Sequence, residues 1–473
     1  MTSSRPRQVR PRAVVDAARQ AAFDALLSVE VDDAYLNLTL PGMLAERGVA
    51  GRDAAFTTEL AHGSARLQGL YDAILDSTLP GGVPALQPEV RTALRLGAHQ
   101  LLSMRVPAHA AVATSVELTR AAAGERPVRL VNAVLRKVAA TSRADWGAAV
   151  APARDADLIG HLSVVHSHPR WIVEAFLDAL GGDAGQTEAL LVADNLPPLV
   201  TLVTRPGLST VADLLAVGAS PGRWSPHAAI MAAGGEPGGL PAVRSGRVGV
   251  QDEGSQLAAL LLARAEPTGA ARDRGERWLD MCAGPGGKAA LLTGLALQQN
   301  ATLIASDRLP HRAALVRSGL RCYPSLPSVL VADGTAAPWR QQAFDRVLVD
   351  APCSGLGALR RRPESRWRRS AGDLDALVTL QVALVLSAVD SLAPGGVVAY
   401  VTCTPHRSET RDVVDAVLRV RDDIVQEDVR ALLPELTDVG PGPHVQLWPH
   451  VHGTDAMFMA VLRRHEPTRL HHR

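Results

Sequence analysis

Two of the four cysteines in this chain, Cys353 and Cys403, lie in short segments that suit covalent chemistry. Cys353 lies in Asp350–Gly355 (DAPCSG), and Cys403 lies in Thr402–Thr404 (TCT). Each segment directly follows a short apolar run that predicts a β-strand. A cysteine thiolate is a strong nucleophile, although a single cysteine is more often a small buried apolar side chain. Two cysteines at the ends of neighbouring strands favour the chemical role.

A glycine-rich turn, Asp280–Lys288 (DMCAGPGGK), is a candidate ligand site. It follows the apolar segment Trp278–Met281 and precedes Ala289–Leu292, which begins a predicted helix. In open parallel sheets, ligands bind where strands end and helices begin. Glycines let the backbone approach a ligand closely, and the first turn of a helix offers free N–H donors. The turn matches neither the Walker loop nor the G-x-G-x-x-G fingerprint.

Three aspartates mark the ends of three further predicted strands, on the same side of the sheet as the glycine turn. Asp307 is placed to accept hydrogen bonds from ribose hydroxyls, and Asp333 to meet an adenine amino group. A single aspartate would more often cap a helix. With Asp350 and the glycine turn, however, the three acids favour a nucleoside ligand. Without a phosphate-binding loop, S-adenosylmethionine is favoured over NAD or ATP.

Two thiols beside a methyl donor suit the methylation of cytosine at carbon 5. That carbon is a poor nucleophile until a thiolate adds to carbon 6 and creates an enamine. After methyl transfer the proton on carbon 5 has to leave so that the thiol is eliminated, and a second thiol can act as the base. Methylation of an exocyclic amine would need no thiol.

The surrounding segments predict a doubly wound α/β sheet with helices on both faces, because strands and helices alternate from Arg247 onward. Strands are expected at residues 278–281, 302–307, 328–333, 344–350, 397–403 and 457–462. Helices are expected at residues 255–263, 289–298, 309–320, 373–392 and 409–420. The helix over 373–392 is expected to stop before Pro394-Gly395-Gly396, and the next strand to begin after it.

Three domains and a tail follow from the periodicity along the chain. Residues 12–145 predict an all-α domain, residues 155–246 a small α+β domain, and residues 247–465 the doubly wound, Rossmann-like domain. Residues 1–11 predict a disordered basic tail. Within the all-α domain, helices are expected at 13–27, 52–75, 88–102, 110–122 and 127–140, with a break at Pro41-Gly42. Its exposed basic residues, such as Lys137, either bind a partner or are ordinary surface charges.

The composition is that of a globular protein, with 47% apolar residues and a net charge of only +1. We find no uninterrupted apolar run of about 20 residues and therefore expect no transmembrane helix. The N-terminus lacks an apolar signal segment and the cysteines form no C-x-x-C pair, which favours the cytoplasm. His161, His166 and His168 have no carboxylate partner at a defined spacing, so we expect no metal site.

Positive charge is concentrated in Arg360–Arg369, directly after the segment that contains Cys353. Such a run is most often a solvated surface, but its place beside a candidate active-site loop favours contact with phosphate groups. Lys288 is one of only two lysines among 49 basic residues, which suggests that the glycine turn needs a compact ammonium group. The sequence predicts RNA-binding side chains at Arg360, Arg361, Arg362 and Arg366.

These motifs resemble those of the RNA (cytosine-5)-methyltransferases, and the helical N-terminal domain is similar to the NusB-like domain of the RsmB family, also called Sun or Fmu. The supporting segments are Asn132–Arg136, Ser167–Pro169 and Val250–Gln256, and the resemblance covers nearly the whole chain. It implies a Rossmann-like, S-adenosylmethionine-dependent methyltransferase domain preceded by an all-α NusB-like domain and a small α+β domain. It also implies methylation of a cytosine in 16S ribosomal RNA. We expect a monomer.

The resemblance also implies roles for individual residues. Cys403 would be the nucleophile, Cys353 would assist release, Asp350 would hold the cytosine and Lys288 would support the site. The cofactor pocket would be lined by Cys282, Ala283, Gly284, Pro285, Gly286, Gly287 and Lys288, with Asp307, Asp333 and Asp350. Gly284, Ala289 and Thr404 depart from the residues most common in the family, but these changes leave the catalytic groups intact.

Two other functions remain open. A transfer RNA (cytosine-5)-methyltransferase would use the same chemistry, although the helical N-terminal domain argues against it. A non-catalytic RNA-binding ribosome assembly factor would keep the fold without using Cys403. Cys322 matches no motif, and no role is predicted for it.

Overall fold

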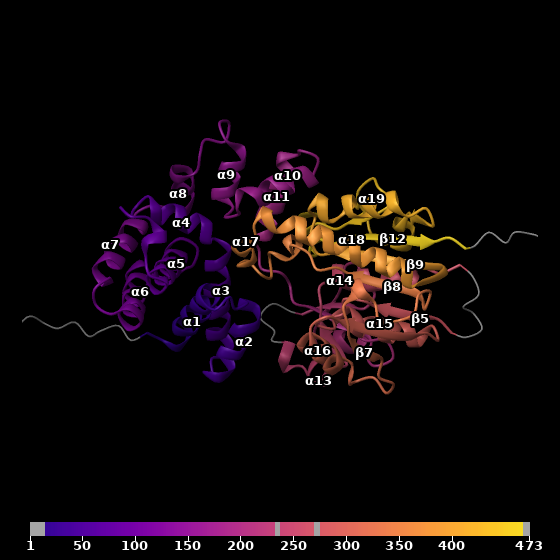
Figure 1. Cartoon of the computed structure of the whole chain (residues 1–473). Coiled ribbons are helices and arrows are strands. Elements are labelled where there is room, and N and C mark those ends of the chain that lie inside the picture. Colours follow the sequence, from indigo (N-terminus) through magenta and orange to yellow (C-terminus); the bar gives the residue numbers. More distant parts are fainter. Residues whose placement is uncertain (1–14, 232–236, 269–274, 467–473) are drawn as a thin grey trace, which may run out of the picture. The chain divides into compact units, whose positions relative to one another are not determined.

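A computed structural model describes residues 15–231, 237–268 and 275–466, and the predicted tail at residues 1–11 lies outside them. The chain forms two compact units. The helical unit contains the described residues up to Glu174 together with Arg360–Arg368, and the α/β unit contains Ala175–Leu359 and the residues from Arg369 onward. Figure 1 labels many of the helices and some of the strands of both units.

The helical unit is a bundle around α5, whose predicted range of 88–102 is confirmed. Its helices are α1 (Ala17–Val31), α2 (Leu36–Glu46), α3 (Gly51–Arg66), α4 (Gln68–Asp76), α5 (Pro88–Leu102), α6 (Ala108–Ala123), α7 (Val128–Val138), α8 (Arg143–Val150) and α9 (Leu158–Val165). The buried side chains of α5 include Leu94 and Leu96, which belong to two different apolar clusters of the bundle. The bundle core is therefore continuous through α5.

Two predictions in the helical unit are wrong. The helix predicted at 52–75 is divided at Leu67, whose backbone angles (φ −102°, ψ 16°) end α3 before α4 begins. The break predicted at Pro41-Gly42 does not occur, because α2 runs through Pro41. Leu36 and Leu40 of α2 are buried, and their packing outweighs the backbone hydrogen bond that a proline inside a helix removes.

After α11 (Ala184–Asp194), the α/β unit forms a four-stranded antiparallel sheet in the order β2-β3-β1-β4. Its strands are β1 (Thr201–Thr204), β2 (Ser220–Pro221), β3 (Ala228–Ile230) and β4 (Val248–Val250). The buried carboxylate of Glu253, at the start of α14 (Glu253–Arg264), accepts hydrogen bonds from the backbone N–H groups of Arg223, Trp224 and Ser225. The region predicted as a separate small domain, residues 155–246, is thus divided. Residues 175–246 lie in one unit with the larger sheet, whereas residues 155–174 belong to the helical unit.

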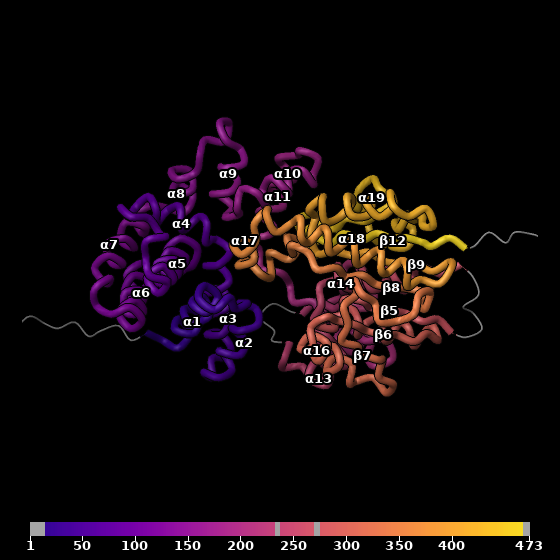
Figure 2. The backbone as a smooth tube through the Cα atoms, viewed as in Figure 1, coloured from indigo at the N-terminus to yellow at the C-terminus, as the bar shows by residue number. Residues whose placement is uncertain are grey.

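The larger sheet has the strand order β10-β12-β9-β8-β5-β6-β7, and β11 pairs with β12. Figure 2 labels β12, β9, β8, β5, β6 and β7 of this sheet. Its strands are β5 (Arg277–Asp280), β6 (Thr302–Asp307), β7 (Ser328–Val331), β8 (Phe344–Asp350), β9 (Leu392–Thr402), β10 (Ile424–Glu427), β11 (Val445–Gln446) and β12 (Phe458–Arg464). Strands β5 to β9 are parallel, whereas β10 and β12 are antiparallel to their neighbours. The predicted Rossmann-like fold class is confirmed.

Helices cover both faces of this sheet, as the alternation of its side chains requires. Trp278 and Leu348 face one apolar cluster, with side chains of α14 and α15 (Gly287–Gln298). Leu279 and Val347 face the other, with side chains of α18 (Leu374–Ser391) and α19 (Arg411–Val420). Helix α16 is formed by Pro310–Leu320. The central strands are buried on both faces, which explains their nearly continuous apolar sequences.

Strand β9 begins at Leu392, five residues earlier than predicted, and includes Pro394-Gly395-Gly396. Gly395 has a φ of +77°, and its carbonyl oxygen accepts a hydrogen bond from Thr268 N at 2.9 Å. A Cβ atom at this position would lie 1.7 Å from Thr268 O. Gly395 therefore lets the backbone at Thr268 approach β9 closely. It lies inside the strand and does not separate the strand from the helix before it.

One helical segment in the described part of the chain, Ala371–Ser391, is long and apolar enough to cross a membrane by length and composition alone. It contains α18, whose side chains Leu384, Val385, Ala388 and Val389 are buried against the larger sheet. Its apolar character therefore has an explanation within the α/β fold.

Candidate active site

The carboxyl ends of β5, β8 and β9 bring the predicted catalytic segments together. Strands β8 and β9 are parallel and in register, with Asp350 opposite Val401. Cys353 follows Asp350 by three residues, and Cys403 follows Val401 by two. The two cysteines therefore emerge from adjacent strands at the same edge of the sheet.

The sulfur atoms of Cys353 and Cys403 lie 3.4 Å apart, and both cysteines are free thiols. The hydrogen bond from Cys353 and the nearby charge of Lys288 lower the pKa of Cys403, although burial opposes this. The same contact raises the pKa of Cys353, and burial raises it further. The first proton lost from the pair therefore leaves Cys403, while Cys353 stays protonated.

Lys288 and Asp350 form a partly buried ion pair beside these thiols, with 2.8 Å between Nζ and Oδ2. Burial disfavours the charged amine of Lys288, but the charge and hydrogen bond of Asp350 outweigh burial and raise its pKa. Lys288 is therefore an ammonium group at neutral pH. Because only Oδ2 of Asp350 holds the lysine, its other carboxylate oxygen can accept a hydrogen bond from a substrate.

The glycine turn is held to β6 by hydrogen bonds from its backbone N–H groups. Ala283 N donates to Ser306 O at 2.8 Å, and Gly284 N donates to Oδ2 of Asp307 at 3.0 Å. Oδ1 of Asp307 accepts from Leu309 N at 2.9 Å. A Cβ atom at Gly284 would lie 2.4 Å from Oδ2 of Asp307, so the glycine allows this close contact. Asp307 positions the turn, and its Oδ2 atom also lies 3.5 Å from Arg312 Nε.

Asp333 lies two residues after β7, which ends at Val331 and not at residue 333 as predicted, and it caps a short 3-10 helix, Gly334–Ala336. Its Oδ1 atom accepts hydrogen bonds from the side chain and the backbone N–H of Thr335, and these bonds lower its pKa. The helix-capping role considered for Asp333 is therefore present. Cys282 lies within the turn, where burial raises the pKa of its thiol and keeps it neutral.

Asp280, the last residue of β5, is a site residue that sequence analysis missed. Its side chain is fully buried, and neither carboxylate oxygen has a hydrogen-bond partner. Burial, and then the negative charge of Asp350, raise its pKa to about 8. Asp280 is the first residue of the glycine motif Asp280–Lys288, and this position was the sequence signal that could have identified it as a site residue. In the described ranges, no group of three or more His, Cys, Asp or Glu side chains is arranged to hold a metal ion.

The segment Arg360–Arg368 packs within the helical unit, and this changes the interpretation of its charges. Arg366 is fully buried, and its Nη1 atom donates to Arg66 O at 2.8 Å and to Ser167 O at 3.1 Å. Arg66 ends α3, where backbone carbonyls lack partners within the helix. The prediction that Arg366 contacts RNA is therefore wrong, because its guanidinium group satisfies buried carbonyls.

The other predicted RNA-binding arginines of this segment differ in exposure. Arg360 is buried, Arg361 is partly buried and Arg362 is exposed, with its guanidinium carbon 5.4 Å from the centre of the Tyr35 ring. Arg362 is thus the side chain of this group that is best placed to meet a phosphate from solvent.

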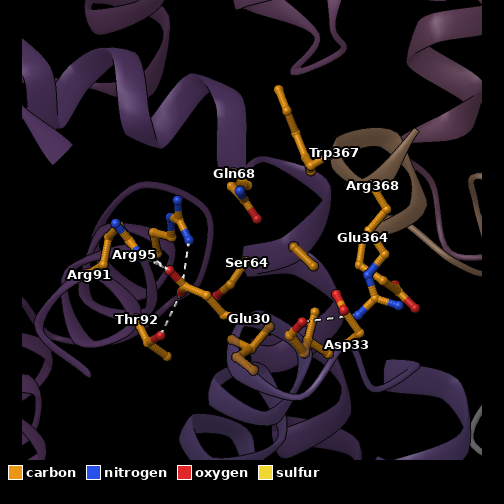
Figure 3. Close-up of a pocket in the computed structure, with 13 residues that line it drawn as sticks. Glu30, Asp33, Ser64, Gln68, Arg91, Thr92, Arg95, Glu364, Trp367 and Arg368 are labelled. Carbon is orange, nitrogen blue, oxygen red and sulfur yellow. Dashed lines mark hydrogen bonds and ion pairs between the residues drawn. The ribbon is translucent and has the colours of Figure 1, made fainter. Parts of the chain in front are cut away.

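A pocket of about 360 Å³ lies within the helical unit, between α1, α3, α5 and the segment Arg360–Arg368 (Figure 3). Its charges largely pair with one another. Glu30 accepts hydrogen bonds from Arg91 and Arg95, and Arg95 also holds Asp72 at 2.8 Å. None of the predicted catalytic or cofactor-binding residues lines it. The pocket is therefore separate from the cysteine pair and the glycine turn.

Comparison with known proteins gives two family matches, each to a different part of the chain. Residues 270–463 match the family described as 16S rRNA methyltransferase RsmB/F, and residues 16–140 match the NusB family. The first match contains the glycine turn and both cysteines, and the second covers the bundle from α1 to α7. The predicted resemblance is confirmed over both regions.

Individual relatives match nearly the whole chain. A protein of Mycobacterium tuberculosis named as a methyltransferase is 49% identical over 97% of this chain and 99% of its own length. Ribosomal RNA small subunit methyltransferase B of Pseudomonas putida is 34% identical over 85% of this chain and 88% of its own length. The solved structure of PH0851 matches 96% of this chain and 100% of its own, with a TM-score of 0.78 and 20% identity.

Proposed function

Because the chain belongs to the RsmB/F family of 16S rRNA methyltransferases, which use S-adenosylmethionine, we propose that it methylates carbon 5 of a cytosine in 16S ribosomal RNA. The proposed reaction passes through a covalent bond between Cys403 and the base, and takes place in the cytoplasm. The observation that carries the proposal is the 3.4 Å separation of the two sulfur atoms at the carboxyl edge of the sheet.

In the first step, the Cys403 thiolate adds to carbon 6 of the cytosine, and the electrons of the carbon 5–carbon 6 bond make carbon 5 nucleophilic. The lowered pKa of Cys403 supports this role. The free oxygen of Asp350 holds the base by its amino group, while Lys288 fixes the carboxylate. When bound, S-adenosylmethionine supplies the electrophilic methyl group.

In the release step, Cys353 acts as the base. While Cys403 is a thiolate, it raises the pKa of Cys353 by its hydrogen bond and its charge. Both influences disappear when the sulfur of Cys403 is bonded to carbon 6. The pKa of Cys353 then falls, although burial and the charge of Glu409 still raise it, and its thiol proton passes to solvent. The resulting thiolate takes the proton from carbon 5, and the bond between Cys403 and carbon 6 breaks.

The cofactor is proposed to lie along Cys282–Lys288, with Asp307, Asp333 and Asp350 at its edges. Gly286 and Gly287 leave the start of α15 without side chains, so backbone N–H groups can approach a ligand there. A Cβ atom at Gly287 would have its nearest neighbours at 3.7 Å, on Gln251. These features fit a nucleoside with ribose hydroxyls that the carboxylates can bind.

Methyl transfer from radiolabelled S-adenosylmethionine tests the proposal, with 16S ribosomal RNA and transfer RNA as alternative substrates. We expect transfer to ribosomal RNA, with the label in 5-methylcytosine. Cys403→Ala should abolish transfer, and Cys353→Ala should accumulate a covalent RNA adduct. Cys322→Ala, which changes a cysteine outside the site, is the matched control. Full activity of Cys403→Ala would overturn the mechanism, and labelling of transfer RNA alone would overturn the substrate.

A further inference from the structure

Glu409 is a fully buried acid to which the proposed reaction gives no role. Its carboxylate accepts three hydrogen bonds from two residues. Oε1 accepts from Ser354 N at 2.8 Å and from Gln381 Nε2 at 3.0 Å, and Oε2 accepts from the Ser354 hydroxyl at 2.5 Å. These donors are a backbone amide, a hydroxyl and a carboxamide. A buried carboxylate that neutral groups hold at several points fixes their geometry.

These hydrogen bonds reach both cysteine segments. Ser354 directly follows Cys353, and Thr404 directly follows Cys403. The hydroxyl oxygens of Ser354 and Thr404 lie 3.0 Å apart. Because the Ser354 hydroxyl donates its proton to Glu409, it accepts the proton of Thr404. One chain of hydrogen bonds therefore runs from Glu409 through Ser354 to Thr404.

The elements around Glu409 hold it in place. Gln381 lies on α18, and its Nε2 atom also donates to Pro352 O at 2.9 Å, next to Cys353. The Tyr400 hydroxyl donates to the backbone oxygen of Glu409 at 2.7 Å. Glu409 itself ends a short 3-10 helix, Arg407–Glu409, ahead of α19. The carboxylate is thus fixed to the same sheet and helix that position the cysteines.

We propose that Glu409 is a positioning residue that sets the spacing of the two thiols by holding Ser354 and, through it, Thr404. This inference rests on the proposed function, because it assigns Glu409 to the step that needs both sulfurs. Addition of Cys403 to carbon 6 needs one thiol. Release needs Cys353 to reach the proton on carbon 5 while Cys403 is still bonded to the base. Loss of Glu409 should therefore slow release more than addition.

Glu409→Gln tests the proposed positioning role with little change in side-chain shape. The new amide nitrogen is a donor where the carboxylate had an acceptor, and it faces a donor of Ser354 or Gln381. We expect kcat to fall by up to about 100-fold, the loss that a 1 Å misplacement of a reacting group can cause. The KM for RNA should change little, and covalent RNA adduct should accumulate as in Cys353→Ala. Asp412→Asn is the matched control, because Asp412 forms a solvent-accessible ion pair with Arg407. This variant should behave as the unaltered enzyme.

The double variant Glu409→Gln/Cys353→Ala separates a positioning role from a general loss of stability. If Glu409 acts through Cys353, the double variant should be no slower than Cys353→Ala alone. The inference would be overturned if the losses in kcat of the two single variants multiply in the double variant. It would also be overturned if Glu409→Gln has the turnover and the amount of covalent adduct of the unaltered enzyme. If Glu409→Gln does not fold, Thr404→Val removes the far end of the hydrogen-bond chain, and the same adduct is expected. Inactivity of Cys403→Ala, measured beside these variants, separates this result from a failure of the proposed function.

Discussion

Lys288 Nζ lies 2.8 Å from Oδ2 of Asp350, and this partly buried pair sets the charge beside Cys403. After the hydrogen bond from Cys353, the ammonium group is a further cause of the lowered pKa of Cys403. In Lys288→Gln the pKa of Cys403 should rise, so the alkaline rise in the single-turnover rate should move up by about one pH unit or more. A rate profile recorded from pH 6 to 10 measures the shift.

Lys137→Gln is the control for this experiment, because Lys137 is the only other lysine in the chain and lies exposed on α7. At saturating RNA its rate profile should match that of the unaltered enzyme. If the rate of Lys288→Gln is lower at every pH but rises over the same pH range as in the unaltered enzyme, Lys288 does not control the pKa of Cys403.

Asp280 should make folding stability depend on pH. Its pKa of about 8 in the folded chain lies above the ordinary value of 3.8. A carboxyl group with a raised folded pKa contributes stability that is fully present below pH 4 and is lost as the pH rises towards 8. Each pKa unit corresponds to about 1.4 kcal/mol. Asp280→Asn, which cannot ionise, should therefore gain thermal stability over the unaltered protein between pH 5 and pH 8.

Melting temperatures of both proteins at pH 5 and pH 8 test this prediction. Asp333→Asn is the control, because hydrogen bonds from Thr335 lower the pKa of Asp333 below its ordinary value of 3.8. Its contribution is lost only on acidification below that value, so its melting difference from the unaltered protein should be the same at pH 5 and pH 8. If the melting difference between Asp280→Asn and the unaltered protein is the same at both pH values, Asp280 is ionised in the folded chain.

Arg366 should matter for stability. Arg366→Ala leaves the buried carbonyl oxygens of Arg66 and Ser167 without this donor, at a cost of about 1–3 kcal/mol for each unsatisfied group. We expect a lower unfolding temperature, with RNA affinity unchanged at temperatures where the variant is folded. Calorimetry and a filter-binding assay measure the two effects, and a loss of affinity without a loss of stability would contradict the assignment.

Arg361 and Arg362 should matter for RNA binding. In Arg361→Ala/Arg362→Ala, each lost phosphate contact should weaken binding and reduce the slope of log affinity against log salt concentration by about one. Binding to a 16S fragment at several salt concentrations measures the slope. Arg430→Ala, an exposed arginine paired with Asp428 on the α/β unit, is the control. An unchanged slope would remove this segment from the RNA interface.

Gly357 holds the two cysteine segments together through the backbone. Its N–H donates to Cys403 O at 2.9 Å, and its carbonyl oxygen accepts from Ala456 N at 2.9 Å. A Cβ atom there would lie 2.0 Å from Ala456 O. Gly357→Ala should therefore displace the segment, with loss of methyl transfer and a lower melting temperature. Gly319→Ala, where a Cβ atom would meet nothing within 4 Å, should leave both unchanged.

The sequence predicted the parts of the fold that are governed by local periodicity. Apolar runs that end in an acid predicted the first and last residues of β6 and β8 correctly. The motifs also predicted that Cys353 and Cys403 lie at the ends of adjacent strands. The short strands β10 and β11 were missed, because four and two residues carry too little pattern. The environments of Arg366 and Asp280 depend on partners distant in the sequence, which no local pattern reveals.

The segment Arg360–Arg368 also has a consequence for how the protein can be divided. The chain passes between its two compact units at three peptide junctions, after Glu174, Leu359 and Arg368. A polypeptide shortened to begin at Ala175 would keep Trp367 and Arg366 but lose every helix against which they pack. Fusing the α/β unit to another protein would thus require a new N-terminus at Ala175 and a replacement for the nine residues Arg360–Arg368.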